Sequence, residues 1–379
     1  MPALLQLVPP DGKVRARPRE REIERHLARF PAKARPRLAA FAREHAWAGD
    51  LVVSFPALAA AIALGPKNAT RDAAFAAVIA GAPLARVAAI TNTPLWLRAA
   101  PPEAFAAAPP LLPDDADFRR SIANYMPKHW KHAPNWLDVI AKAFDVGDSA
   151  IALWFAREAP RTKDRAARNS GNERLVALYA WLCAPGHIRG SEAIPPWRAE
   201  MAWNAARAAA TDWREATLLE LYLLDGVADP WFEPARIGAY EFAPLNTTAD
   251  LCEEAAAMSH CVRTYGYEIA SNHRRIWSVR KDGARVATLS LRAPNGFMPT
   301  VDELSGPSNA LVDAETAAAV HGWLSAQDVR RFPPARYAYM PATIDQTRWR
   351  AIWREWWRAK KRVPHWLPLY GSEGVLYAL

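Results

Sequence analysis

The chain has 379 residues, of which 51% are hydrophobic and 23% are charged, and its formal net charge is +9. This length and balance fit a folded protein of two or three domains with a hydrophobic core. They exclude a chain that is disordered throughout and a collagen-like fibre, and its three cysteines are too few for a disulfide-stapled fold.

The positive charge is concentrated near the two ends of the chain. Residues 11–45 and residues 348–362 each carry a net charge of +6, whereas residues 46–347 carry −2. Two basic ends point to an anionic partner such as DNA or RNA. The alternative is compositional, because a chain rich in Ala, Arg, Pro and Trp is also what a GC-rich genome encodes.

The cysteines and the apolar runs indicate in which cellular compartment the protein is expected. Cys183, Cys252 and Cys261 have no CxxC spacing, so neither a zinc site nor a disulfide framework is predicted. The apolar run in residues 1–10 is too short for a signal peptide, and the uncharged run 51–66 is too short for a membrane span. We expect a cytoplasmic protein without a membrane span.

Helices are predicted for the first 240 residues, in two regions. Residues 1–110 combine a basic arm with helices at 19–30 and 37–48, and with an Ala-rich stretch that is broken at each proline because proline cannot donate a backbone hydrogen bond. Leu38, Phe41 and Trp47 are the expected apolar face of the second helix. Residues 111–240 predict helices at 118–125, 136–144, 150–158, 173–183 and 197–224, with an exposed loop at 161–172.

The pattern changes near residue 240. A helix is expected over 246–265, with Thr247 and Asp250 as a capping box. Strands at 275–280 and 284–292 flank Lys281-Asp282-Gly283, a good hairpin turn, and a third strand is expected at 297–304 before a helix at 313–326. This α-β-β-β-α domain at 241–326 makes the fold class α+β. A Pro-rich linker and a basic, Trp-rich amphipathic helix at 346–362 complete the chain, within a region 327–379.

Three pieces of this domain resemble a known family. They read LCEEAAAMSHCVRTY at 251–265, IWSVRKDGARVATLSL at 276–291 and ELSGPSN at 303–309. In order and spacing they resemble the PcfJ-like family, named for an accessory protein of conjugative plasmids, over residues 245–325. The family usually has Gln where this chain has Glu303. The resemblance implies a mobile-element setting and carries no established activity.

The residues themselves predict where the chemistry lies. On the expected helix, Leu251, Ala255 and Met258 share a buried face, and Cys261 beside it is expected to be a small buried hydrophobe. Adjacent helical residues point about 100° apart, so His260 and Cys261 form no dyad and His260 is directed elsewhere, within reach of the hairpin.

Strand alternation sorts the hairpin into two faces. One face is expected to pack against the helix at 246–265 and consists of Trp277, Val279, Ala287, Leu289 and Leu291. The other is polar and carries Ser278 and Arg280 beside Ile276, and Thr288 and Ser290 beside Val286. It is either a solvated surface or a site in which Arg280 holds a phosphate or carboxylate and His260 acts as acid, base or hydrogen-bond donor. The catalytic candidates are His260, Arg280, Thr288 and Glu303. The expected pocket residues are Cys261, Tyr265, Ser278 and Asn309, and the turn 305–309 either closes over a ligand or is an ordinary turn.

The basic ends supply the nucleic-acid candidates. On the last helix Arg350, Arg354, Arg358 and Lys361 form one stripe, and Trp349, Ile352, Trp353 and Trp356 form another. The Trp stripe either docks on the helical body or stacks on bases, and such a helix also suits an anionic membrane surface. In the N-terminal arm Arg15, Arg17 and Arg19 recur at every second position, which suits either a phosphate track or a solvated tail.

No metal and no cofactor is predicted. His129 and His132 are three residues apart, but no third ligand is near them. The chain has no Walker loop, no GxGxxG after a strand, no nucleophile elbow and no HExxH. Three hypotheses follow: an accessory protein that binds nucleic acid or a partner protein through its basic ends, an enzyme of undefined reaction with the pocket above, and a helical scaffold for protein assembly.

Overall fold

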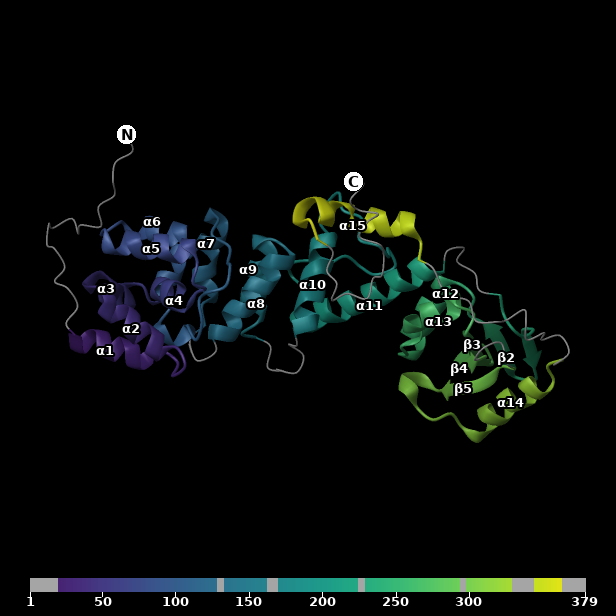
Figure 1. Cartoon of the computed structure of the whole chain (residues 1–379). Helices are drawn as coiled ribbons and strands as arrows, with labels where there is room; N and C mark the ends of the chain where they lie inside the picture. Colours follow the sequence, from purple (N-terminus) through teal and green to yellow (C-terminus); the bar gives the residue numbers. More distant parts are fainter. Residues whose placement is uncertain are drawn as a thin grey trace. The chain divides into compact units, whose positions relative to one another are not determined.

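The computed structural model describes residues 20–127, 133–161, 170–223, 229–293, 298–328 and 344–362. They form an α+β protein in which helices fill the N-terminal part and a five-stranded antiparallel sheet lies in the C-terminal half (Figure 1). The chain divides into two compact units. The first contains the described residues up to Trp181 together with Arg198–Asn204, and the second contains Leu182–Trp197 and the described residues from Ala205 onward.

The first unit is helical, and prolines set several of its helix starts. Pro56 is the first residue of α4, and Pro83 immediately precedes α6, in keeping with the predicted breaks. The helices are α1 (Glu20–Arg29), α2 (Arg35–Glu44), α3 (Ala46–Ser54), α4 (Pro56–Leu64), α5 (Ala69–Ile79), α6 (Leu84–Ile90), α7 (Ala116–Ile122), α8 (Ala133–Val146), α9 (Ser149–Glu158) and α10 (Ser170–Leu182), with short 3₁₀ turns η1 (Leu95–Ala99), η2 (Pro102–Ala104) and η3 (Ala123–Tyr125).

The helix predicted over 37–48 is two helices. His45 is extended, at φ −162°, and its Nδ1 accepts a hydrogen bond of 3.2 Å from the amide of Trp47, so His45 ends α2 and caps α3. Leu38 and Phe41 are buried as expected, but Trp47 is exposed. The predicted apolar face was wrong at Trp47 because this break rotates the following residues away from it.

The second unit contains most of one long helix, a sheet and six shorter helical elements. The segment 197–224, expected to hold one long helix or two, holds one, which begins at Trp203 and not at the predicted Trp197. Its expected apolar positions from Trp203 to Leu221 are buried; Leu224 lies outside the described residues. The elements are α11 (Trp203–Tyr222), β1 (Ala235–Ile237), β2 (Tyr240–Pro244), α12 (Thr248–Met258), η5 (Val262–Tyr265), α13 (Gly266–Ala270), β3 (Arg274–Lys281), β4 (Ala284–Arg292), β5 (Thr300–Ser305), η7 (Pro307–Asn309), α14 (Ala314–Ser325) and α15 (Gln346–Lys360).

The helix predicted over 246–265 stops at Met258. Thr247 and Asp250 form the expected capping box. At the other end Ser259 takes the left-handed conformation, at φ 54°, and the amide of His260 donates to the carbonyl of Ala255 at 3.2 Å. This is a helix-ending turn. The sequence has no Gly or Pro there to signal it.

The sheet is a meander with strand order β1-β2-β3-β4-β5. β3 and β4 are joined at Asp282-Gly283, which both have positive φ, as the hairpin turn requires. β5 begins three residues after the predicted start. The β1–β2 hairpin was not predicted. Gly238, at φ 59°, makes its turn, and the buried Tyr240 and Phe242 alternate along β2.

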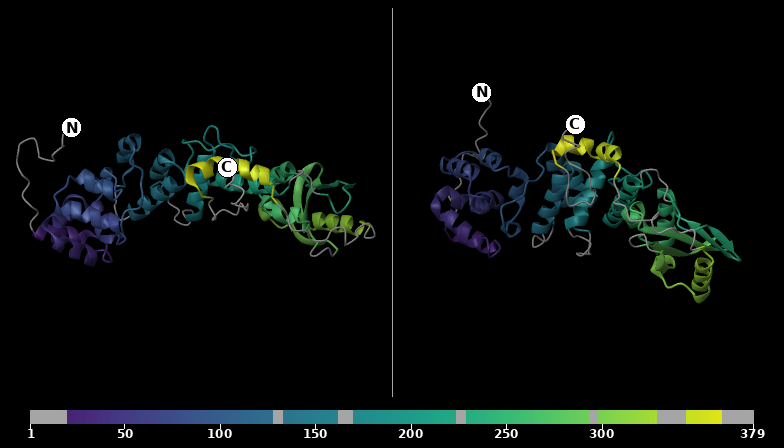
Figure 2. Two further views of the ribbon diagram at one scale, coloured as in Figure 1. Left: turned by 45° about the horizontal axis from the view of Figure 1, so that its top comes forward. Right: turned by 45° about the vertical axis from the view of Figure 1, so that its right-hand side comes forward.

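Helices cover both faces of the sheet, with α12 on one side and α14 on the other (Figures 1 and 2). The face with Trp277 and Leu289 packs on α14, where Trp323 stacks on Phe242 with ring centroids 4.8 Å apart. The prediction that this face meets the motif helix was therefore wrong. The opposite face, with Ile276, lies under Leu251 and Ala255 of α12.

Three residues of the polar face of the hairpin are buried, so the solvated-surface alternative is wrong for them. Ser278, Thr288 and Ser290 are each at most 4% exposed. A β-bulge opposite Arg280 leaves Val286 unpaired, so Val286 packs with the α14 cluster instead of beside Thr288. Arg285 takes the α12 side instead, where it bonds Glu254.

Candidate functional site

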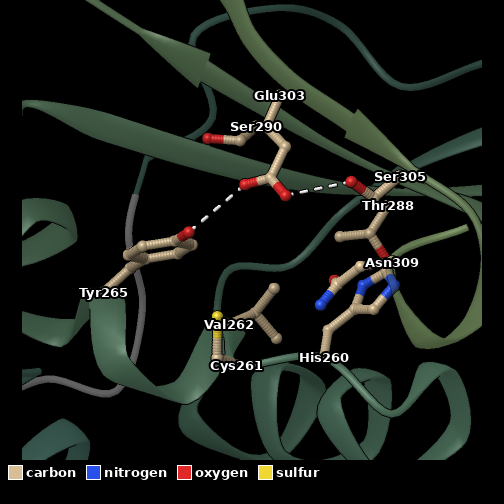
Figure 3. Close-up of a pocket in the computed structure, with 9 residues that line it drawn as sticks. All are labelled: His260, Cys261, Val262, Tyr265, Thr288, Ser290, Glu303, Ser305 and Asn309. Atoms are coloured by element: carbon tan, nitrogen blue, oxygen red, sulfur yellow. Dashed lines mark hydrogen bonds between the residues drawn. The ribbon is translucent and has the colours of Figure 1, made fainter. Parts of the chain in front are cut away.

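A small pocket forms where α12 ends against strands β4 and β5 (Figure 3). The end of α12 and η5 supply His260, Cys261, Val262 and Tyr265. The strands and the following turn supply Thr288, Ser290, Glu303, Ser305 and Asn309. The cavity volume is about 10 Å³, which is the room that one water molecule needs.

Three of the four catalytic candidates line this pocket, namely His260, Thr288 and Glu303, and Arg280 does not. Arg280 lies at the hairpin end of β3, where its Nη1 is 4.0 Å from Glu241 on β2. Of the expected pocket residues, Cys261, Tyr265 and Asn309 line the cavity, and Ser278 is buried outside it.

His260 anchors the turn that follows β5. The ring is buried, and its Nε2 lies 2.6 Å from the carbonyl oxygen of Gly306. Because a carbonyl only accepts, Nε2 must carry the proton, which leaves Nδ1 as the acceptor in the neutral ring. The turn itself is tightly wound, since Ser308 and Asn309 both have positive φ. His260 thus has a positioning role in addition to any chemistry.

Glu303 is bound through both carboxylate oxygens. Oε2 accepts from the hydroxyl of Tyr265 at 3.3 Å, and Oε1 accepts from the hydroxyl of Ser305 at 2.9 Å (Figure 3). Burial, with the neighbouring thiol of Cys261 and the carboxylate of Glu303, raises the pKa of Tyr265 to about 12. Tyr265 therefore keeps its proton near neutral pH and acts as a donor to Glu303.

The cation beside the pocket is Arg274, which sequence reasoning missed. Its guanidinium lies 4.1 Å from the centroid of the Tyr265 ring, and its Nη1 bonds Ser290 at 2.6 Å and Asp302 at 2.7 Å. Glu268 binds its Nε. The predicted strand began one residue too late. Extending the two-residue alternation back from Ile276 would have placed Arg274 on this face.

Thr288 is held by a second residue that sequence reasoning missed, the fully buried Glu254 of α12. The Thr288 hydroxyl donates to Oε1 of Glu254 at 2.7 Å, and Arg285 Nε donates to Oε2 at 2.9 Å. The sequence did indicate that Glu254 is buried, because it follows Leu251 by three residues and so shares the buried face of the helix. Thr288 thus fastens α12 to the sheet.

Cys261 is exposed, so the prediction of a buried hydrophobe was wrong. The cause is the early end of α12, which takes Cys261 off the helix face. His260 and Cys261 do diverge, one buried and one exposed, but the turn at Ser259 causes this rather than helical geometry. Burial raises the pKa of the other thiol in this region, that of Cys252.

The pocket offers a carboxylate, a thiol, an imidazole and hydroxyls in a space of water size. Within the described ranges no group of three or more His, Cys, Asp or Glu side chains could hold a metal ion. His129 and His132 lie outside those ranges. Hydrogen bonds already engage His260 Nε2 and both oxygens of Glu303. The geometry therefore supports a well-ordered polar cluster more directly than a substrate-filled active site.

A separate candidate surface lies on α15. Asp345 caps this helix by accepting from the amide of Arg348 at 2.9 Å, and Asp345 itself donates its amide to the carbonyl of Leu221 in α11 at 2.8 Å. The apolar stripe is buried, as the docking interpretation predicts, and consists of Trp349, Ile352, Trp353, Trp356 and Trp357. The rings are therefore not available for stacking on bases.

The cations of α15 point the other way. Arg354, Arg358 and Lys361 are exposed, and Arg350 is half-buried. Arg358 pairs with Glu355 at 2.8 Å. These four residues, hereafter the α15 basic face, keep most of their charge available to an anion. Arg15, Arg17 and Arg19 lie outside the described residues.

Comparisons of the sequence with protein-family models and with curated proteins give no match, and comparison of the fold with solved structures gives none. In the part of the chain that the structure describes, no helix has the length and apolar character needed to cross a membrane.

Proposed function

We propose that this chain is an accessory protein of a mobile genetic element that binds nucleic acid through phosphate contacts, with no catalysis of its own. The observation that supports it is the division of α15 into a buried Trp stripe and an outward basic face. The resemblance of residues 245–325 to the PcfJ-like family supports the mobile-element setting. The basic arm with Arg15, Arg17 and Arg19 is the second proposed contact, and a partner protein with an acidic surface is the alternative ligand.

The division of α15 determines the kind of binding we expect. With its rings buried, the helix offers charge rather than stacking, so affinity should depend on phosphate number more than on base sequence. Each phosphate contact makes the slope of log affinity against log salt more negative by about 0.9 for duplex DNA. Four contacts, one of them shared with Glu355, correspond to a slope of about −3.

The test is fluorescence anisotropy with labelled single- and double-stranded DNA and RNA across a salt series. One variant replaces the α15 basic face by Gln, and it should lose most of the salt-dependent affinity. A matched control removes four exposed cations of the first unit. One of them, Arg120, is paired with a carboxylate three residues away, as Arg358 is on α15. The control substitutions are Lys33→Gln, Lys67→Gln, Arg86→Gln and Arg120→Gln. No binding by the unmodified protein at low salt, or an equal loss in both variants, would refute the proposal.

An enzyme of undefined reaction is the second candidate. The observation in its favour is that His260, Cys261 and Glu303 meet around one cavity. The hydrogen bonds that already engage His260 and Glu303, and the remote position of Arg280, count against it. A helical scaffold for protein assembly is the third, and it would be favoured by a complete absence of nucleic-acid binding.

A further inference from the structure

A second, larger pocket lies in the same unit, on the other side of the η5 turn. It is bounded by the C-terminal half of α11 and by residues of η5 and α13, and its volume is about 480 Å³. That is within the range of small-molecule pockets. Gly266 allows the two walls to approach, because a Cβ atom there would lie 3.1 Å from the Cα of Leu219. Residues 260–267 thus line both pockets.

The charges in this pocket balance. Arg214 and Arg263 face Glu215, with Asp212 beside them, and Nη2 of Arg263 bonds Asp212 at 2.5 Å. Two cations and two anions give no net attraction for a phosphate. The pocket therefore favours an uncharged group with both donors and acceptors on its edge.

Hydrogen-bonding capacity remains unused at the centre. Glu215 is only 13% exposed, and its oxygens lie 3.7 Å from Arg214 and 3.7 Å from Arg263, too far for hydrogen bonds. Within the described part of the chain, Nε of Arg263 is also buried without a hydrogen-bond partner. Burial raises the pKa of Glu215, with Arg263 and Arg214 opposing this effect. A ligand that donates to this carboxylate and accepts from the guanidinium of Arg214, which is 31% exposed, would bond to both groups.

The remaining lining is mostly apolar, with Thr264 as its polar residue. Leu218 and two tyrosines contribute, and the rings of Tyr222 and Tyr267 meet edge to face with centroids 5.5 Å apart. Tyr267 is 42% exposed. Aromatic rings in an apolar pocket bind planar rings well.

We propose that this pocket binds a planar, uncharged heteroaromatic ring of the nucleobase type, with guanine as the base that fits best. Guanine has two adjacent N–H donors for the two oxygens of Glu215. On its other edge it has the O6 and N7 acceptors for a guanidinium. Cytosine, uracil and adenine each lack this pair of adjacent donors. The inference does not depend on the α15 basic face, because the pocket lies on other residues.

Isothermal titration calorimetry of the full chain with guanosine monophosphate tests the proposal, with the adenosine, cytidine and uridine monophosphates as comparators. A second arm uses a short single strand with one guanine, and the same strand without it, to distinguish a free nucleotide from an unpaired base. We expect guanosine monophosphate to bind at least about tenfold more tightly than the others.

Two substitutions locate the binding. Glu215→Gln should weaken binding of guanosine monophosphate by at least about tenfold, because it replaces one acceptor by a donor while it keeps the shape. Glu241→Gln is the matched control, since Glu241 also lies beside two arginines, on β1 and β3, away from the pocket. No binding at millimolar concentration in either arm, equal affinity for all four bases, or an equal effect of the two substitutions would overturn the proposal.

Discussion

The buried carboxylate of Glu254 should be a principal attachment of α12 to the sheet. It is 0% exposed, it accepts from Thr288 at 2.7 Å, and it pairs with Arg285, which is 29% exposed, at 2.9 Å. A hydrogen bond to a buried charge contributes about 1.5–3 kcal/mol. The partly exposed ion pair contributes no more than about 1 kcal/mol. Glu254→Ala should therefore destabilise the second unit by about 2–4 kcal/mol.

The neighbouring Glu253 gives a matched control. It pairs with the same Arg285 at 3.5 Å but is 72% exposed, so Glu253→Ala should cost no more than about 0.5 kcal/mol. Glu254→Gln keeps the shape and one acceptor, and it should fall between the two. Thr288→Val tests the other end of the bond, and its effect should not add to that of Glu254→Ala.

Hydrogen exchange of β3 and β4 amides is the suitable assay, because a chain of two compact units need not unfold in one step. The expected result is a loss of protection in Glu254→Ala that corresponds to the free energy above. Protection in Glu254→Ala equal to that in Glu253→Ala would refute the reasoning and would mean that α12 is held by its apolar contacts alone.

Three further outcomes follow from the same contacts. Cys261 is exposed and the pKa of Cys252 is raised by burial, so a thiol reagent should modify Cys261 first. Cys261→Ser should remove the fast phase of thiol modification. A fast phase that persists in this variant would contradict the assignment of that phase to Cys261. The pKa of Tyr265 is raised to about 12, so the folded state keeps a proton that the unfolded chain loses at about pH 10. Stability should therefore fall between about pH 10 and 12, and by less in Tyr265→Phe; equal pH profiles would argue against it. Trp353 is fully buried and Arg354 is exposed, so Trp353→Ala should destabilise α15 by about 3–5 kcal/mol and Arg354→Ala by no more than about 0.5 kcal/mol. Hydrogen exchange of the α15 amides measures both, and similar costs would place the Trp stripe outside the core.

Features with a local cause were predictable from the sequence. Prolines begin helices, Thr247 and Asp250 cap α12, and Asp282-Gly283 turns the hairpin, because each depends on the backbone preferences of one to four residues. The burial of the Trp stripe on α15 follows from helical periodicity in the same way. These signals determined the fold class, and alternation along the hairpin placed Thr288 in a predicted group with His260, Glu303 and Arg280.

Features that depend on distant contacts needed the tertiary structure. Ser259 ends α12 without Gly or Pro, because the chain must turn to place His260 against Gly306, 46 residues later. That turn exposes Cys261. It also places residues of η5 in the walls of both pockets. The small β1–β2 hairpin exists because β3 offers it an edge, with Tyr240 and Phe242 packing under α14 and against the sheet.

Alternation along a strand identifies which residues share a face, but it does not identify what covers that face. The sequence determined that Ser278, Thr288 and Ser290 lie together; only the tertiary structure decided that α12 buries them and that α14 takes the opposite face. Likewise, the bulge at Val286 selects Arg285 to meet Glu254, and the length of β3 selects Arg274, rather than Arg280, as the cation at the pocket. Burial and bulges depend on elements far apart in the chain, so they are decided when those elements pack together.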